Sequence, residues 1–194
     1  MGEEAHLDPT RPRRADAVRN RARLIEVAKA MFSGADPGLE AIAKAAGVGI
    51  GTLYRHFPTR DKLIEAVYRT ETQNLAEAAS RLSETLPPVE ALRDWLRLFV
   101  DYIATKHVMS PALASMVGGT SELYAESGAQ VKAAIGLLVD RAVASGAIRL
   151  DIEPLDLLRA LAGVAGISSV PGWEESAKRL VDILIAGVRI PPEA

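Results

Sequence analysis

Apolar residues recur with the 3.6-residue period of an α-helix along most of the chain, and charged residues fill the opposite side of each stretch. Glycine, proline and serine separate one stretch from the next. This pattern predicts an all-α fold of about nine helices. The expected helices of the second half are residues 89–104, 111–117, 122–144, 154–168 and 174–188. Residues 147–152 could pair briefly as extended chain.

The first third of the chain predicts a group of shorter helices. The first helix is expected from Asp16 to about Phe32. Asp36 then resembles an N-cap for the second helix, with Pro37 at its first helical position. The second helix should end before Gly47, which is well placed to take the left-handed conformation that terminates a helix.

A third, short helix is expected over residues 50–57, where Pro58 ends it. Thr59 offers an N-cap for a long helix that continues to about Leu82. We therefore divide the chain into a flexible basic arm of residues 1–14, a helix-turn-helix domain of residues 15–58 and a helical domain of residues 59–194.

Residues 39–57 meet the requirements of a helix-turn-helix, in which a tight turn joins two short helices and the second enters the major groove of DNA. Ala43 is small where the two helices cross, and Gly47 provides the turn. Leu53 and Phe57 belong to the buried side of the second helix. The residues expected to face outward are Ile50, Gly51, Thr52, Tyr54, Arg55 and His56.

The outward-facing residues have a chemistry that suits DNA. The hydroxyls of Thr52 and Tyr54 can bind phosphate, and Arg55 can reach phosphate or guanine. Ile50 can touch a thymine methyl, while Gly51 lets the DNA approach the backbone closely. Tyr54 could instead fill the core of the small domain.

Charge is distributed unevenly along the chain. Residues 11–69 hold twelve lysines and arginines against six acidic residues, whereas the rest holds eleven against nineteen, within a net charge of -2. A basic N-terminal third fits a polyanionic partner, and a solvated charged surface explains it equally well. Arg14 in the arm can follow phosphates or simply be solvated. His56 can bind phosphate or pack inside the domain.

The segment Ile42 to Leu63, which reads IAKAAGVGIGTLYRHFPTRDKL, resembles the DNA-binding domain of the TetR/AcrR family of transcriptional regulators. The resemblance covers roughly residues 16–68. It implies a homodimer whose paired helices read a palindromic operator, and a C-terminal domain that binds a small-molecule effector. By position, it implies backbone contacts from Thr52, Tyr54, His56 and Arg60, and groove-facing positions at Ile50, Gly51 and Arg55.

Some positions depart from the family pattern. Gly38 stands where serine or threonine usually caps the second helix, and Gly49 replaces a frequent serine before the third. Lys62 stands where an acidic residue often completes the cap of the long helix. We expect Arg60 and Lys62 to lie near the DNA, because they open that helix.

The chain beyond Leu82 has no phosphate-binding glycine motif, paired carboxylates or Ser/His/Asp signature, so neither catalysis nor a cofactor is expected. The absence of cysteine excludes disulfides and thiolate metal sites. An apolar or aromatic ligand could lie among the helices, although such side chains are more often core residues. The candidate ligand contacts are Trp95, Phe99, Tyr102, His107, Met116 and Tyr124.

The two helices expected over residues 154–168 and 174–188 carry more apolar surface than is needed to pack two terminal helices within one chain. Their apolar residues are Leu157, Leu158, Leu161, Val164, Leu180, Ile183, Leu184 and Val188. In the family such helices commonly build the dimer interface, and the glycines and alanines among them would allow a close approach. Packing within one chain is the alternative.

No apolar stretch approaches the roughly 18 residues of a membrane span, and the first residues lack the apolar segment of a secretory signal, so we expect a cytoplasmic protein without membrane contact. The sequence predicts a DNA-binding regulator, a repressor that an apolar or aromatic ligand releases from its operator. A transcriptional activator, a ligand-binding or adaptor protein with a degenerate helix-turn-helix, and an enzyme housed in the helical domain are alternatives.

Overall fold

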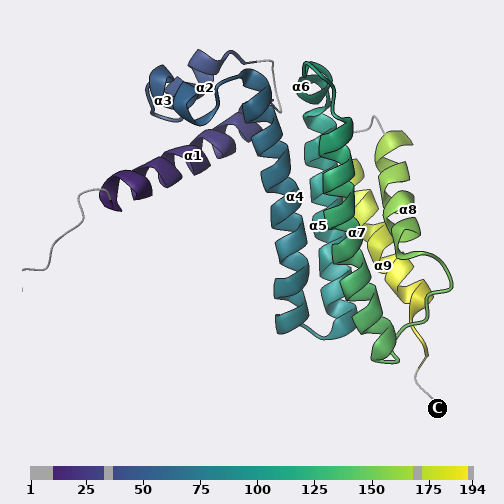
Figure 1. Ribbon diagram of the computed structural model, residues 1–194. Helices are drawn as coiled ribbons and strands as arrows, with labels where there is room; N and C mark the ends of the chain where they lie inside the picture. Colours follow the sequence, from purple (N-terminus) through teal and green to yellow (C-terminus); the bar gives the residue numbers. More distant parts are fainter. Residues whose placement is uncertain (1–10, 33–36, 168–171, 192–194) are drawn as a thin grey trace, which may run out of the picture. The chain divides into compact units, whose positions relative to one another are not determined.

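The computed structural model describes residues 11–32, 37–167 and 172–191, whose regular secondary structure is helical apart from one isolated bridge (Figure 1). The helices are α1 (Arg11–Phe32), α2 (Leu39–Ala45), α3 (Ile50–His56), α4 (Arg60–Thr85), α5 (Pro88–Val108), α6 (Ser110–Ala114), α7 (Ser121–Ala144), α8 (Pro154–Ile167) and α9 (Trp173–Val188). The all-α prediction is confirmed. The bridge pairs Ile148, which lies in the segment that was expected to pair briefly, with Arg189 in the antiparallel sense.

The chain divides between residues 67 and 68 into two compact units. The first unit contains α1, α2, α3 and the first two turns of α4, whereas we expected a domain boundary after residue 58. The start of α4 belongs with the short helices because the Arg60 guanidinium lies 5.2 Å from the centre of the Phe32 ring. Leu63, one turn further along, is fully buried.

The first helix is longer than its apolar pattern predicts. α1 begins at Arg11, so residues 11–14 of the expected arm are helical, and residues 1–10 lie outside the described residues. Pro12 is compatible with this early start because proline is tolerated in the first turn of a helix, where its missing N–H would have no partner.

The second helix begins differently from its expected cap. Gly38 is the N-cap, with φ -68° and ψ 154°, and no side chain of the described residues caps the helix. Pro37 therefore precedes the cap, and the expectation that it opens the helix was wrong. The Gly38 backbone is extended, and its carbonyl accepts hydrogen bonds from the N–H groups of Ala41 and Ile42, so Leu39 is the first helical residue. Asp36 lies outside the described residues.

The transition from α3 to α4 follows from a proline and a threonine. α3 ends at His56, one residue earlier than expected, because Pro58 disfavours the helical conformation at Phe57, which has φ -134° and ψ 90°. The N–H of Lys62 donates to the Thr59 hydroxyl at 3.2 Å. The predicted Thr59 cap is thereby confirmed.

In the second unit, α5 packs on α7, α8 and α9, and α8 packs on both α7 and α9 (Figure 1). Trp95 anchors this core, since its side chain is fully buried and its indole N–H donates to the carbonyl of Leu75 at 2.8 Å. α6 ends at Ala114, short of the expected end at residue 117, because the chain then turns through Gly118 and Gly119 with positive φ values.

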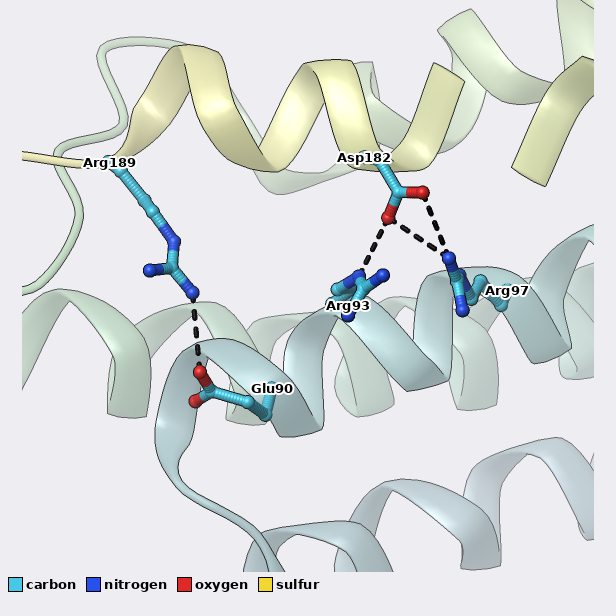
Figure 2. Close-up of polar contacts among 5 residues, drawn as sticks. All are labelled: Glu90, Arg93, Arg97, Asp182 and Arg189. Atoms are coloured by element: carbon cyan, nitrogen blue, oxygen red, sulfur yellow. Dashed lines mark hydrogen bonds and ion pairs between the residues drawn. The ribbon is translucent and has the colours of Figure 1, made fainter. Parts of the chain in front are cut away.

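Ion pairs connect α5 with α9 along one seam (Figure 2). The α5–α9 seam consists of Glu90, Arg93, Arg97, Asp101, Lys178, Asp182 and Arg189. Asp182 accepts hydrogen bonds from Arg93 at 2.7 Å and from Arg97 at 2.9 Å, and the bond from Arg93 is the main reason that the pKa of Asp182 is lowered. Because these side chains are partly exposed, the ion pairs of the seam add little to the stability of the fold.

Candidate nucleic-acid interface and cavity

The turn between α2 and α3 is a Schellman motif. The N–H of Gly47 donates to the carbonyl of Lys44 at 3.1 Å, and the N–H of Val48 donates to the carbonyl of Ala43 at 3.0 Å. Gly47 has a φ of 66°, which confirms its predicted left-handed conformation. The left-handed conformation costs a residue with a Cβ about 1–2 kcal/mol of conformational free energy, so glycine is the residue that best fits this tight turn.

A small apolar core lies beneath α3, and two arginines of α1 contact the residues that end α2 and α3. Leu53 is fully buried and Phe57 nearly so. The Arg21 guanidinium lies 5.3 Å from the centre of the Phe57 ring, and Arg23 donates to the carbonyl of Ala46 at 3.4 Å. Because Leu53 is buried on the inner side of α3, the opposite side of the helix faces solvent.

The predicted outward side of α3 lies at the surface. We call Ile50, Gly51, Thr52, Tyr54, Arg55 and His56 the recognition face. Tyr54 is 45% exposed, so it does not fill the core, and a Cβ added to Gly51 would meet nothing within 4 Å. Within the described part of the chain, the side chains of Thr52, Tyr54 and Arg55 form no hydrogen bond or ion pair. Their polar groups are therefore open to a partner.

The remaining candidate DNA contacts have neighbours of their own. His56 is half-buried and its ring lies 6.2 Å from that of Phe57, which is compatible with packing and with an outward contact. The ammonium of Lys62 lies 2.7 Å from a Glu65 carboxylate oxygen. Arg60 stacks on α1, as described above, and the side chain of Arg14 lies outside the described residues.

The second unit contains a cavity of about 230 Å³ between α4, α5, α7 and α8. This volume is just below the range of about 300–1,000 Å³ that is common for ligand sites. The cavity is lined by Tyr68, Phe99, Tyr102, Ile103, Lys106, Tyr124, Ser127, Gly128, Val131, Leu155, Leu158, Arg159 and Ala162. Its walls are mainly apolar and aromatic, with a few polar groups among them.

Two tyrosines form a hydrogen-bonded pair in the cavity wall. The hydroxyl of Tyr102 donates to that of Tyr68 at 2.9 Å, and the Thr72 hydroxyl lies 3.3 Å from that of Tyr102. Burial is the main cause that raises the pKa of Tyr68, and the bond with Tyr102 adds to it. The raised pKa keeps the Tyr68 hydroxyl protonated, and its bond with Tyr102 holds two polar groups in place in an otherwise apolar wall.

Lys106 is the most unusual charged group of the cavity. It is partly buried, and its ammonium lies 4.3 Å from the centre of the Tyr124 ring and 5.9 Å from that of Tyr68. Burial lowers the pKa of Lys106. The faces of the two rings offset part of the cost of keeping this charge away from water.

The six candidate ligand residues separate into two groups. Phe99, Tyr102 and Tyr124 line the cavity. Trp95 lies in the core with its N–H bonded to the backbone, so it is shielded from the cavity. His107 points to solvent from α5, and Met116 lies in the turn after α6, so neither lines the cavity.

Sequence reasoning missed Tyr68, Lys106, Ser127 and Arg159 as lining residues. Lys106 had a usable signal, because it follows Tyr102 by four residues and therefore shares the helix face that begins at Phe99. Tyr68 and Arg159 come from helices far apart in sequence, and no local pattern brings them to one cavity.

Metal sites and membrane-spanning helices are absent from the described residues. In the parts of the chain that the structure describes, no group of three or more histidines and acidic residues is placed to hold a metal ion. None of the described helices is both long and apolar enough to cross a membrane.

Comparison with known proteins identifies similar chains. Residues 24–67 match the family model of bacterial regulatory proteins of the tetR family, and residues 87–190 match the C-terminal domain of SbtR-like transcriptional regulators. The crystal structure of the TetR transcriptional regulator SCO0520 from Streptomyces coelicolor is 45% identical, with a TM-score of 0.79 over 89% of this chain and 99% of that one.

Two other relatives are similar at lower identity. The structure of a TetR transcription regulatory protein from Mycobacterium vanbaalenii is 31% identical, with a TM-score of 0.75 over 91% of this chain and 99% of that one. The uncharacterized HTH-type transcriptional regulator Rv1255c from Mycobacterium tuberculosis is 34% identical over 99 residues, which are 48% of this chain and 46% of that protein. The match thus spans about half the length of this curated relative.

Proposed function

Because this chain belongs to the TetR family of bacterial transcriptional regulators, we propose that it binds a palindromic operator as a homodimer and represses transcription until a small apolar or aromatic ligand releases it. A DNA-binding regulator is what the family comparison supports directly. Members of the family are typically dimeric, ligand-binding repressors and are generally not enzymes. The protein acts in the cytoplasm, where its DNA partner is found.

The observation that carries the DNA-binding half of the proposal is the recognition face. It combines an open backbone at Gly51 with polar side chains at Thr52, Tyr54 and Arg55 that have no partner among the described residues. Hydroxyls and guanidinium groups on an exposed helix of this kind suit phosphates and base edges of the major groove. The Schellman turn and the buried Leu53 fix the orientation of that helix in its domain.

Selection of bound fragments from random or genomic DNA tests the proposal. We expect a palindrome whose half-sites are centred one helical turn apart, about 34–36 Å. Its affinity should fall steeply with salt, because bound phosphates release counterions. Arg55→Gln should weaken binding at least tenfold, whereas Arg149→Gln in the second unit, which removes a similarly exposed arginine, should leave it unchanged. Failure to enrich any palindrome would contradict the proposal.

The proposed dimer forms through α8 and α9. Leu157, Leu158 and Leu161 are buried within the chain, so they are not the contact surface. Ile183 is 64% exposed on α9, and Gly187 follows it by four residues on the same side. An exposed isoleucine beside small residues suits a close, twofold helix contact.

Light scattering of the purified protein tests this interface. Ile183→Glu should convert dimers into monomers at micromolar concentration and weaken operator binding, because a buried carboxylate at a twofold axis meets its own copy. Leu137→Glu on α7 is the matched control, since Leu137 is 46% exposed and lies on another helix. A dimer that survives Ile183→Glu would place the interface elsewhere.

The proposed switch uses α4, which contributes Arg60 to the first unit and Tyr68 to the cavity of the second. A ligand that contacts Tyr68 therefore acts on the helix that begins next to the recognition face in sequence. A shift of this helix would change the spacing of the two recognition helices in the dimer. Coupling of about 1–3 kcal/mol is typical and would change operator affinity by about 5- to 150-fold.

A further inference from the structure

Lys106 in the cavity wall has a charge that nothing in the described chain neutralises. No carboxylate among the described residues lies within ion-pair distance of its ammonium, and burial is the only cause of its altered pKa. Acidic residues on the helices that form the cavity wall have other partners, since Glu126 on α7 pairs with Arg69 and Asp101 on α5 lies 2.7 Å from Lys178. A partly buried ammonium without an anionic partner is costly, and an anion would offset that cost.

We propose that the cavity binds a small amphipathic anion, whose negatively charged oxygen group pairs with Lys106 and whose apolar body lies against Phe99 and Val131. This inference rests on the proposed function, because it names the chemical class of the ligand for the same cavity. It goes beyond an apolar ligand by requiring one negative charge.

The other polar groups of the cavity favour Lys106 as the anchor. Arg159 also lines the cavity, but its guanidinium lies 2.6 Å from Asp156 and its side chain is 71% exposed. The hydroxyls of Tyr68 and Tyr102 bond to each other and carry no positive charge. Lys106 is therefore the cation in the described wall that is both unpaired and partly withdrawn from water.

The size and lining of the cavity restrict the body of the ligand. A volume of about 230 Å³ suits a single ring or a short alkyl chain better than a large fused-ring compound. The apolar wall binds such a body by the hydrophobic effect, while the ammonium binds its charged end. Monocarboxylates of this size are the simplest molecules that satisfy both requirements.

Calorimetric titration of the full chain without DNA tests the inference with two isosteric pairs, benzoate against benzamide and hexanoate against hexanamide, at matched ionic strength. Each carboxylate should bind at least tenfold more tightly than its amide. Lys106→Met keeps the alkyl stem and should remove this preference while leaving amide binding unchanged, and Lys106→Arg should retain the preference. Lys132→Met on the exposed side of α7 is the control and should behave as the wild type.

Equal binding of carboxylate and amide to the wild type, a preference that survives Lys106→Met, or no saturable binding of any of the four probes would overturn the inference. Thermal unfolding of each variant shows whether it is folded. Because the titrations contain no DNA, their failure would leave operator recognition intact. Conversely, failure of the DNA selection to find an operator would not change the result of the carboxylate titrations.

Discussion

Gly51→Ala is a substitution for which stability and DNA binding should change in opposite directions. Gly51 is the second residue of α3, where its backbone is helical, and a Cβ at this position would meet nothing within 4 Å. Nothing in the described part of the free chain therefore opposes the added methyl group. In the proposed complex, by contrast, this is the point at which DNA approaches the backbone.

The two effects can be estimated separately. Glycine in a helix is less stable than alanine by roughly 0.5–1 kcal/mol, so the substitution should stabilise the protein by up to about that amount. For a chain of this length that corresponds to an increase in Tm of roughly 1–4 °C. A displaced base contact costs about 1–3 kcal/mol, which lowers operator affinity about 5- to 150-fold.

Urea unfolding and fluorescence anisotropy with the selected operator measure the two quantities on the same preparation. Gly136→Ala is the matched control, because Gly136 lies within α7 of the second unit and its added Cβ also meets nothing within 4 Å. It should stabilise the protein without changing operator affinity.

Two outcomes for Gly51→Ala would refute the reasoning. Unchanged operator affinity in a folded variant would mean that the recognition face does not approach DNA at Gly51. A loss of stability would mean that the α3 backbone needs glycine for a reason that its helical geometry does not reveal.

Three further predictions concern stability and are checked by denaturation. Gly47→Ala should destabilise the protein by about 1 kcal/mol because of its left-handed φ of 66°, and Gly47→Asn should cost less; equal costs in urea unfolding would contradict this. Trp95→Phe should cost about 1–3 kcal/mol, since it removes a buried N–H donor to Leu75 and leaves space in the core, whereas the less buried Trp173→Phe should cost much less. The pKa of Asp182 is lowered in the folded chain, so its ionised carboxylate stabilises the fold above the ordinary carboxyl pKa, and this stabilisation is lost as the pH falls through the lowered value. The Tm difference between the wild type and Asp182→Asn should therefore shrink on acidification. A difference that grows in acid would contradict that linkage.

The sequence alone determined the helix-turn-helix, because each of its features is local. Gly47 follows an amphipathic stretch and takes the left-handed conformation, and Thr59 caps the helix that starts one residue later. Burial of Leu53 and exposure of Tyr54 follow from their positions on the two sides of one short helix. Such features depend on neighbours within a few residues, so they can be predicted without tertiary structure.

Tertiary structure decided which residues face the cavity. Trp95 and Phe99 lie on one stripe of α5 and stack with their ring centres 6.0 Å apart, yet Trp95 is sealed in the core whereas Phe99 lines the cavity. Helical periodicity shows that both face inward, but it does not show where the neighbouring helices leave a space. Tyr68 and Lys106 meet there from different helices. That meeting depends on how α4, α5 and α7 pack, which is a property of contacts between distant segments and not of any local pattern.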